Sequence, residues 1–228
     1  MKFSNKIHKC GLSPIRKFYP YQLECNKKGI KIYHLNIGQP DIETPPAYFE
    51  AVRDFTLPVL EYAPSPGLPV LIDAVKKYYA GIGVELENSD ITISSGGSEA
   101  LQMVLNCILD DGDEIIIPEP FYPNYRTFVN LTGGSIVPLH TSPEEGYKYV
   151  DRERIEALIT PNTRAIMFTN PATPRALSFP KKRCAPLRIS PRPTTCSSSA
   201  TRYIVNSYTT ERYLWIPSPS LRISPTTP

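Results

Sequence analysis

Apolar positions recur at three- and four-residue steps in several stretches of the chain, and this spacing predicts amphipathic helices. Between them lie short, almost wholly apolar runs, which are typical of buried strands. The pattern predicts helices over 47–55, 68–80, 99–109 and 151–159, and strands over 91–94, 114–120, 135–139 and 164–170. Because helices and strands alternate from residue 46 to 171, we expect an α/β fold with a mostly parallel sheet and helices on its faces.

After Pro171 this pattern ends. The segment contains no glycine and no aspartate, is rich in Pro, Ser and Thr, and shows no sustained helical or strand period. Its single acidic residue is Glu211, whereas its basic residues are Arg175, Lys181, Lys182, Arg183, Arg188, Arg192, Arg202, Arg212 and Arg222. We expect an N-terminal arm over 1–45, a partial large domain over 46–171, and an irregular or disordered basic tail over 172–228.

The composition bounds the number of domains and the cellular location, but it does not indicate a reaction. A chain of 228 residues, 41% hydrophobic, is long enough for one ample domain or two small ones. Its five cysteines are scattered without a CxxC pair, which predicts no zinc or redox motif and favours a cytoplasmic location. The N-terminus MKFSNKIHKCGLSPIRKF lacks the apolar core of a signal peptide, and no apolar run is long enough to span a membrane.

The stretch SSGGSEA, residues 94–100, follows a predicted strand and opens a predicted helix. Free amides at a helix N-terminus and the positive end of the helix dipole can hold a phosphate, helped here by the Ser98 hydroxyl. The alternative is that the glycines serve only the turn.

Three further blocks occur around this one: NIGQPD at 36–41, YAPSPGLP at 62–69 and EPFYPNY at 119–125. In order and spacing, the four blocks resemble fold-type I pyridoxal-phosphate enzymes, specifically class I aminotransferases of the aspartate aminotransferase kind. The resemblance covers about 30–171. It implies part of the family's large domain, a three-layer structure whose seven-stranded sheet is not laid down in sequence order, so that late strands lie between early ones.

The resemblance also assigns roles to residues. It implies that the Gly38 amide binds the carboxylate of an amino acid or 2-oxo acid substrate, and that Tyr62 reaches the cofactor phosphate of the neighbouring subunit in a homodimer. Within one subunit, it implies that pyridoxal 5'-phosphate is held by Gly97, Ser98 and Glu99, with Tyr122 stacked on its ring. The alternatives are turn glycines and a core tyrosine.

The next family block, NPGNPTG, corresponds to Asn-Pro-Ala-Thr-Pro-Arg-Ala at 170–176, and Leu177 follows it. Thr173 stands where the family's second asparagine binds the O3' atom of the cofactor. Deleting one G from the codons AAC CCG GGC AAC CCC ACG GGC GCT gives AAC CCG GCA ACC CCA CGG GCG CT, which encodes the observed residues. The same one-base shift allows the family's SDEVY block to underlie residues 200–204. We therefore interpret the segment after Pro171 as out of frame.

This hypothesis affects the expected activity. Transamination requires a Schiff-base lysine and a carboxylate beside the pyridine nitrogen. Thr201 occupies the carboxylate position, Ile204 that of the block's tyrosine, and the lysine block falls beyond Pro228. We expect residues 1–228 to include no catalytic residue and to be an inactive fragment. The alternatives are a working aminotransferase whose sequence is wrong after residue 171, and a non-enzymatic protein whose basic tail binds an anionic partner. Arginines interrupted by prolines argue against a specific nucleic-acid site.

Overall fold

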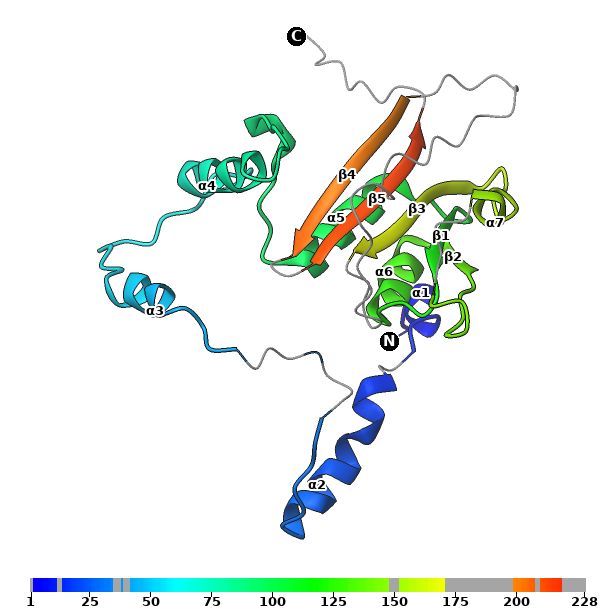
Figure 1. The fold of residues 1–228 in the computed structure, drawn as a ribbon, viewed down its shortest axis with the longest axis horizontal. Coiled ribbons are helices and arrows are strands. Elements are labelled where there is room, and N and C mark those ends of the chain that lie inside the picture. The colour runs from blue at the N-terminus through cyan, green and yellow to red at the C-terminus, as the bar shows by residue number, and fades with distance from the viewer. Residues whose placement is uncertain are drawn as a thin grey trace. The chain divides into compact units, whose positions relative to one another are not determined.

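The computed structural model describes residues 2–11, 14–34, 38, 42–147, 152–170, 199–207 and 210–218. The chain divides into two compact units (Figure 1). The first unit comprises Met1–Lys31 and Gly96–Pro228, and the second comprises Ile32–Ser95.

A sheet with the strand order β2-β1-β3-β5-β4 forms the centre of the first unit. Its strands are β1 (Glu114–Pro118), β2 (Ser135–Leu139), β3 (Thr163–Asn170), β4 (Ser199–Ser207) and β5 (Thr210–Ser218). The first three are mutually parallel, with Ile116 opposite Val137 on one side and Ile166 on the other. Strand β5 pairs antiparallel with both β3 and β4. The three strands before Pro171 therefore confirm the predicted parallel arrangement.

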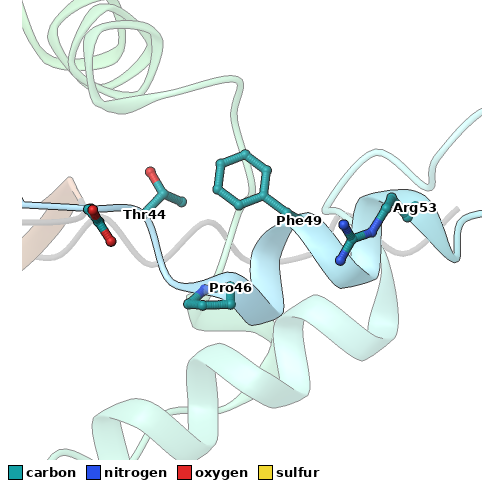
Figure 2. A pocket seen from close by; sticks show the side chains of 5 residues that line it. Thr44, Pro46, Phe49 and Arg53 are labelled. Atoms are coloured by element: carbon teal, nitrogen blue, oxygen red, sulfur yellow. The ribbon is translucent and has the colours of Figure 1, made fainter.

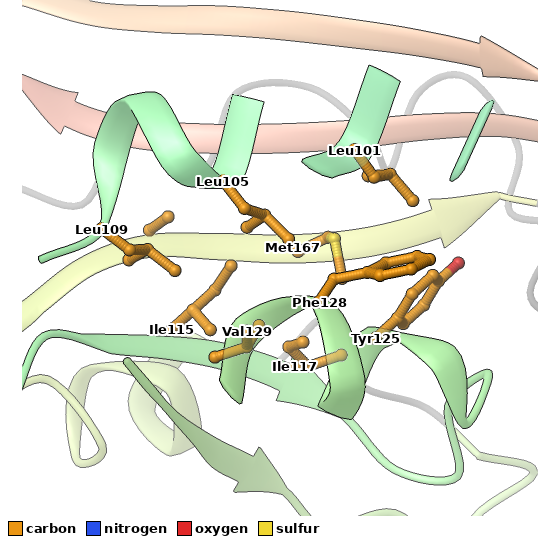
Figure 3. Close-up of a cluster of buried hydrophobic side chains, with 10 residues drawn as sticks. Leu101, Leu105, Leu109, Ile115, Ile117, Tyr125, Phe128, Val129 and Met167 are labelled. Atoms are coloured by element: carbon orange, nitrogen blue, oxygen red, sulfur yellow. The ribbon is translucent and has the colours of Figure 1, made fainter. Parts of the chain in front are cut away.

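One face of this sheet is covered by α5 (Gly97–Ile108) and α6 (Asn124–Thr132). Side chains alternate across a strand, so every second residue of β1 and β3 points to this face. Figure 3 shows the resulting core. Its buried members are Leu101, Leu105, Leu109, Ile115, Ile117, Tyr125, Phe128, Val129, Ala165 and Met167.

The opposite face carries α7 (Arg152–Glu156), whose Ile155 is buried. Ile155 packs in a second cluster with Ile116, Ile166 and Leu139, the residues that alternate with those of the first cluster. Helices thus lie on both sides of the sheet, and the predicted three-layer architecture is confirmed.

The N-terminal region forms α1 (Asn5–His8), the 3-10 helix η1 (Pro14–Phe18) and α2 (Tyr19–Lys27). Helix α1 docks on the C-terminal turn of α6. Lys6 Nζ donates to the Thr132 carbonyl at 3.2 Å, and Asn130 Nδ2 donates to the Lys9 carbonyl at 2.8 Å.

The second unit contains α3 (Pro46–Arg53), α4 (Pro69–Ala80) and the 3-10 helix η2 (Asn88–Asp90). Ile72 and Tyr79 of α4 are buried, as is Ile91. Gly67, just before α4, has a φ of +122°, and a Cβ there would collide with the Ile93 side chain. Only glycine satisfies both constraints without strain.

Two predictions about strands need correction. Residues 91–94 were expected to form a strand but form no ladder, although the Ile93 amide donates to the Pro66 carbonyl at 2.8 Å. A strand needs a neighbour, and no strand of the described residues pairs with this segment. Conversely, β4 and β5 lie in the segment expected to be irregular. They contain the β-branched and aromatic runs Tyr-Ile-Val and Tyr-Leu-Trp-Ile, which favour strands.

Candidate cofactor site

The phosphate-binding prediction falls on the first turn of α5. The helix begins at Gly97 and its N-cap is Gly96, which has no side chain to bond the amides of the first turn. Gly97 is half-buried, while Ser98 and Glu99 are exposed. Backbone amides, a positive helix end and an open hydroxyl therefore meet at one place, and this combination favours an anion.

This turn lies at the end of the sheet where β3 ends. Leu101, one turn further along α5, packs in the same buried cluster as Tyr125 and Met167. In Figure 3, Leu101 and Tyr125 lie near the arrowhead of β3, and Leu109 lies near its start. In open α/β sheets, ligands bind at this carboxyl edge of the parallel strands.

Tyr122 lies at the same edge, because it follows β1 by four residues. Its ring is half-buried and meets Tyr125 edge-to-face, with centroids 5.6 Å apart. The Tyr122 hydroxyl accepts a hydrogen bond from Asn124 Nδ2 at 3.0 Å. Below it, the Tyr125 hydroxyl hydrogen-bonds Thr169 Oγ1 at 3.0 Å, and both of these residues are buried. This pair ties the first turn of α6, directly after the loop that carries Tyr122, to the end of β3.

The remaining predicted residues are placed differently. Gly38 is exposed, with no heavy atom within 4 Å of where a Cβ would stand. Tyr62 is fully exposed, at 103% of its reference area. Both belong to the second unit, whereas Gly97, Ser98, Glu99 and Tyr122 belong to the first. Thr173 lies outside the described residues.

The second unit also has an open hollow of about 540 Å³ beside α3 (Figure 2). It is lined by Glu43, Thr44, Pro46, Phe49 and Arg53, and none of the predicted site residues is among them.

Neither a metal centre nor a membrane span is found in the described ranges. They contain no group of three or more His, Cys, Asp or Glu side chains placed to hold a metal ion. Nor does any helix within those ranges have the length and apolar character needed to cross a bilayer.

Sequence reasoning missed a group of residues around the tyrosine-bearing loop: Glu119, Arg126, His140 and the buried pair Tyr125–Thr169. The carboxylate of Glu119 lies 3.0 Å from His140 Nδ1, a partner 21 positions away in sequence. The continuous apolar runs of β1 and β2 are the signal that could have brought these two residues together, because strands that follow one another in the chain are usually neighbours in a sheet.

The fold has three layers, its strands β1, β2 and β3 are parallel, and a glycine-rich helix start and an aromatic residue lie at their carboxyl edge. These features define a domain of the class that binds phosphate-bearing cofactors. The family model for aminotransferase class I and II matches residues 30–188, so its match continues past Pro171. The chain belongs to this family.

Relatives agree with the assignment. The chain is 34% identical over 162 residues to the aspartate/prephenate aminotransferase of Thermus thermophilus. The aligned region covers 70% of this chain and 42% of the relative. It is 31% identical to an arginine–pyruvate transaminase of Pseudomonas aeruginosa over 68% of this chain and 40% of the relative. The chain thus spans about two-fifths of the length of these curated relatives.

Solved structures show the same fold. The aspartate aminotransferase of Thermus thermophilus with maleate matches with a TM-score of 0.72 and 30% identity, over 80% of this chain and 48% of that one. The alanine aminotransferase of Pyrococcus furiosus matches with a TM-score of 0.70 and 33% identity, over 79% of this chain and 47% of that one. Family membership implies pyridoxal 5'-phosphate as the cofactor.

Proposed function

We propose that residues 1–228 carry the phosphate-binding and ring-stacking part of an aminotransferase site. The observation that carries this proposal is that Ala100, in the first turn of α5, and Tyr122 both pack against the buried cluster that reaches the carboxyl edge of β1 and β3. Amides of Gly97 and Ser98 and the Ser98 hydroxyl would hold the phosphate, and Tyr122 would lie against the pyridine ring. The Glu99 amide would contribute to the same cradle.

The residues present fit this cofactor. A phosphate needs several donors and a positive potential, which the start of a twelve-residue helix with no side-chain cap hydrogen bond supplies. A flat heterocycle needs an aromatic surface beside it, which the half-buried Tyr122 supplies. When bound, the cofactor serves as an electron sink for bonds broken at the α-carbon of an amino acid.

Titration with pyridoxal 5'-phosphate tests the proposal. Ser98→Ala and Tyr122→Ala should each weaken binding, because one removes a phosphate donor and the other removes the stacking surface. Ser135→Ala and Tyr21→Ala change an exposed serine and an exposed tyrosine elsewhere in the unit and should leave affinity unchanged. Pyridoxal, which lacks the phosphate, should bind much more weakly than the phosphorylated cofactor. Equal binding of the two compounds would contradict the assignment to α5.

The substrates we propose are an amino acid and a 2-oxo acid, with the Gly38 amide on the substrate carboxylate. The relatives' names cover aspartate, prephenate and arginine–pyruvate reactions, so they support the reaction class and not one substrate. We also propose a homodimer in which Tyr62 serves the partner's site. The complete exposure of Tyr62 supports this, and sedimentation velocity of the wild-type chain and of Tyr62→Ala tests it.

We further propose that residues 1–228 by themselves do not exchange amino groups, because Thr201 replaces the required carboxylate and no described lysine stands in the family's anchoring context. Incubation with labelled glutamate and unlabelled 2-oxoglutarate should give no label transfer above that of the free cofactor. Transfer that depends on the protein would refute this proposal and favour a working enzyme.

We propose that a frameshift after Pro171 is the reason why residues 1–228 lack the required carboxylate and lysine. It also underlies the proposed division into an arm over 1–45, a partial large domain over 46–171 and an out-of-frame tail over 172–228. Reading the nucleotide sequence around codon 172 in three frames tests it: the shifted frame should continue into SDEVY and then into the lysine block. The family match up to residue 188 does not itself mark a break at Pro171. We also propose a cytoplasmic location, with no membrane partner and no specific nucleic-acid partner.

A further inference from the structure

The loop over 119–123 carries Tyr122 from the end of β1 to the start of α6. Both backbone polar groups of its first residue, Glu119, make hydrogen bonds at the end of β2. The Glu119 amide donates to the Leu139 carbonyl at 2.9 Å, and Thr141 Oγ1 donates to the Glu119 carbonyl. The loop is therefore tied to the end of β2 as well as to β1.

The side chain of Glu119 adds a second set of contacts. Its carboxylate is 3.0 Å from His140 Nδ1 and 3.9 Å from the Arg126 guanidinium. The Glu119 side chain is 31% exposed, less than either partner, so its charge is only partly screened by water. The carboxylate thus joins the end of β2 to the first turns of α6.

Arg126 extends this link back into the loop. Its guanidinium carbon lies 5.5 Å from the centroid of the Phe121 ring, a cation–π contact. Phe121 in turn stacks on the buried Tyr125 with an interplanar angle of 20°. Both neighbours of Pro120 are therefore fixed, Glu119 by charge and Phe121 by ring contacts.

We propose that Glu119 is a positioning residue, whose carboxylate, through His140 and Arg126, fixes the loop so that Tyr122 presents its ring at the carboxyl edge of the sheet. Tyr122 is half-buried, so the direction of its ring depends on the backbone that carries it. The functional side of this inference rests on the proposed stacking of Tyr122 on the cofactor.

The first experiment measures the loop without any ligand. The chain has one tryptophan, Trp215, so the double change Trp215→Phe and Tyr122→Trp puts the sole indole at the position of interest. In this background, Glu119→Ala should raise the acrylamide quenching constant about twofold to threefold and lower the anisotropy, because it removes the carboxylate contacts to His140 and Arg126. The effect should stay modest, because partly exposed ion pairs are weak and the backbone contacts of Glu119 remain. Glu119→Gln keeps the shape and should give part of the effect.

A matched control removes a comparable ion pair elsewhere. Glu24 of α2 pairs with Lys28 at 3.0 Å, outside the loop. Glu24→Gln should leave quenching unchanged. All variants are compared only where their far-ultraviolet circular dichroism matches that of the wild-type chain, and Glu119→Gln serves if Glu119→Ala does not fold.

The second experiment measures affinity for pyridoxal 5'-phosphate with Tyr122 intact. Glu119→Ala should raise the Kd about threefold to tenfold, and Glu24→Gln should not. Unchanged quenching in Glu119→Ala overturns the proposal whatever the affinity, and changed quenching with unchanged affinity overturns its functional side. If the wild-type chain binds no cofactor, or Tyr122→Ala binds as well as wild type, the proposed function fails instead, and quenching alone decides the role of Glu119.

Discussion

Leu105 gives the sharpest test of the packing that holds α5, and with it the turn proposed to bind phosphate, against the sheet. Its side chain is 1% exposed and lies in the cluster formed by α5, α6, β1 and β3. Met103, two residues earlier on the same helix, is 46% exposed and points away from that cluster. The two positions share a helix and differ in burial, so they form a matched pair.

The expected cost follows from the atoms removed. Leu105→Ala deletes three buried carbons, which is worth roughly 2.5 kcal/mol of lost transfer free energy. The cavity left behind adds to this, so that the total should be about 3–4 kcal/mol, within the range measured for buried leucines. Met103→Ala loses less buried surface and gains helix propensity, so its cost should stay below about 1 kcal/mol.

Urea unfolding followed by far-ultraviolet circular dichroism measures both variants. With a slope of about 2 kcal/mol per M, Leu105→Ala should lower the midpoint by roughly 1.5–2 M, and Met103→Ala by less than about 0.5 M. Equal midpoint shifts for the two variants would refute the packing of α5 on the sheet as described.

Two further predictions concern the first unit. Gly133 ends α6 with a φ of +97°, and a Cβ there would collide with an aspartate carboxylate, so Gly133→Ala should destabilise by about 1–3 kcal/mol. Gly112→Ala, at a φ of +90° with open space around it, should cost less in the same urea assay. The pKa of Glu144 is lowered by a hydrogen bond from its own backbone amide and a smaller one from the Ser142 hydroxyl. The ionised carboxylate of Glu144 therefore stabilises the fold at pH values above its unfolded pKa, and this stabilisation is lost as the pH falls through the folded pKa. Ser142→Ala removes the smaller cause, so the Glu144 pKa measured by NMR titration should move part of the way back toward its ordinary value.

The sheet could be predicted from sequence where burial dominates the pattern. Strands β1, β2 and β3 were each found within a few residues of their bounds, because strands buried on both faces read as continuous apolar runs. Helix α5 was found for a different reason: its buried residues follow the helical period and its start coincides with the glycine-rich turn.

Helix α6 was not predicted, although its signal is present. Tyr125, Phe128, Val129 and Thr132 are buried at helical spacing, and Gly133 provides a left-handed C-terminal cap. The aromatic block that begins at Glu119 was interpreted as the end of a strand, and this interpretation hid the helical period that starts inside it. The wrong strand over 91–94 has the opposite cause: its local pattern is adequate, but pairing depends on a partner that local pattern cannot supply.

The residues of the candidate site also fall into two groups, those that a local motif predicts and those whose contacts depend on strand pairing. Gly97, Ser98 and Tyr122 could be predicted as site residues because each lies in a contiguous motif, whereas the contacts of Glu119 depend on two strand ends that meet only in the folded sheet. All of these residues lie between 97 and 140, and β3, which completes this edge, ends at Asn170. The proposed phosphate-binding half of the site thus comes from a continuous part of the chain before Pro171. A change of reading frame beyond that residue would remove the groups that act on substrate while leaving the residues proposed to bind the cofactor in place, which is why binding and amino-group exchange are separable tests of this chain.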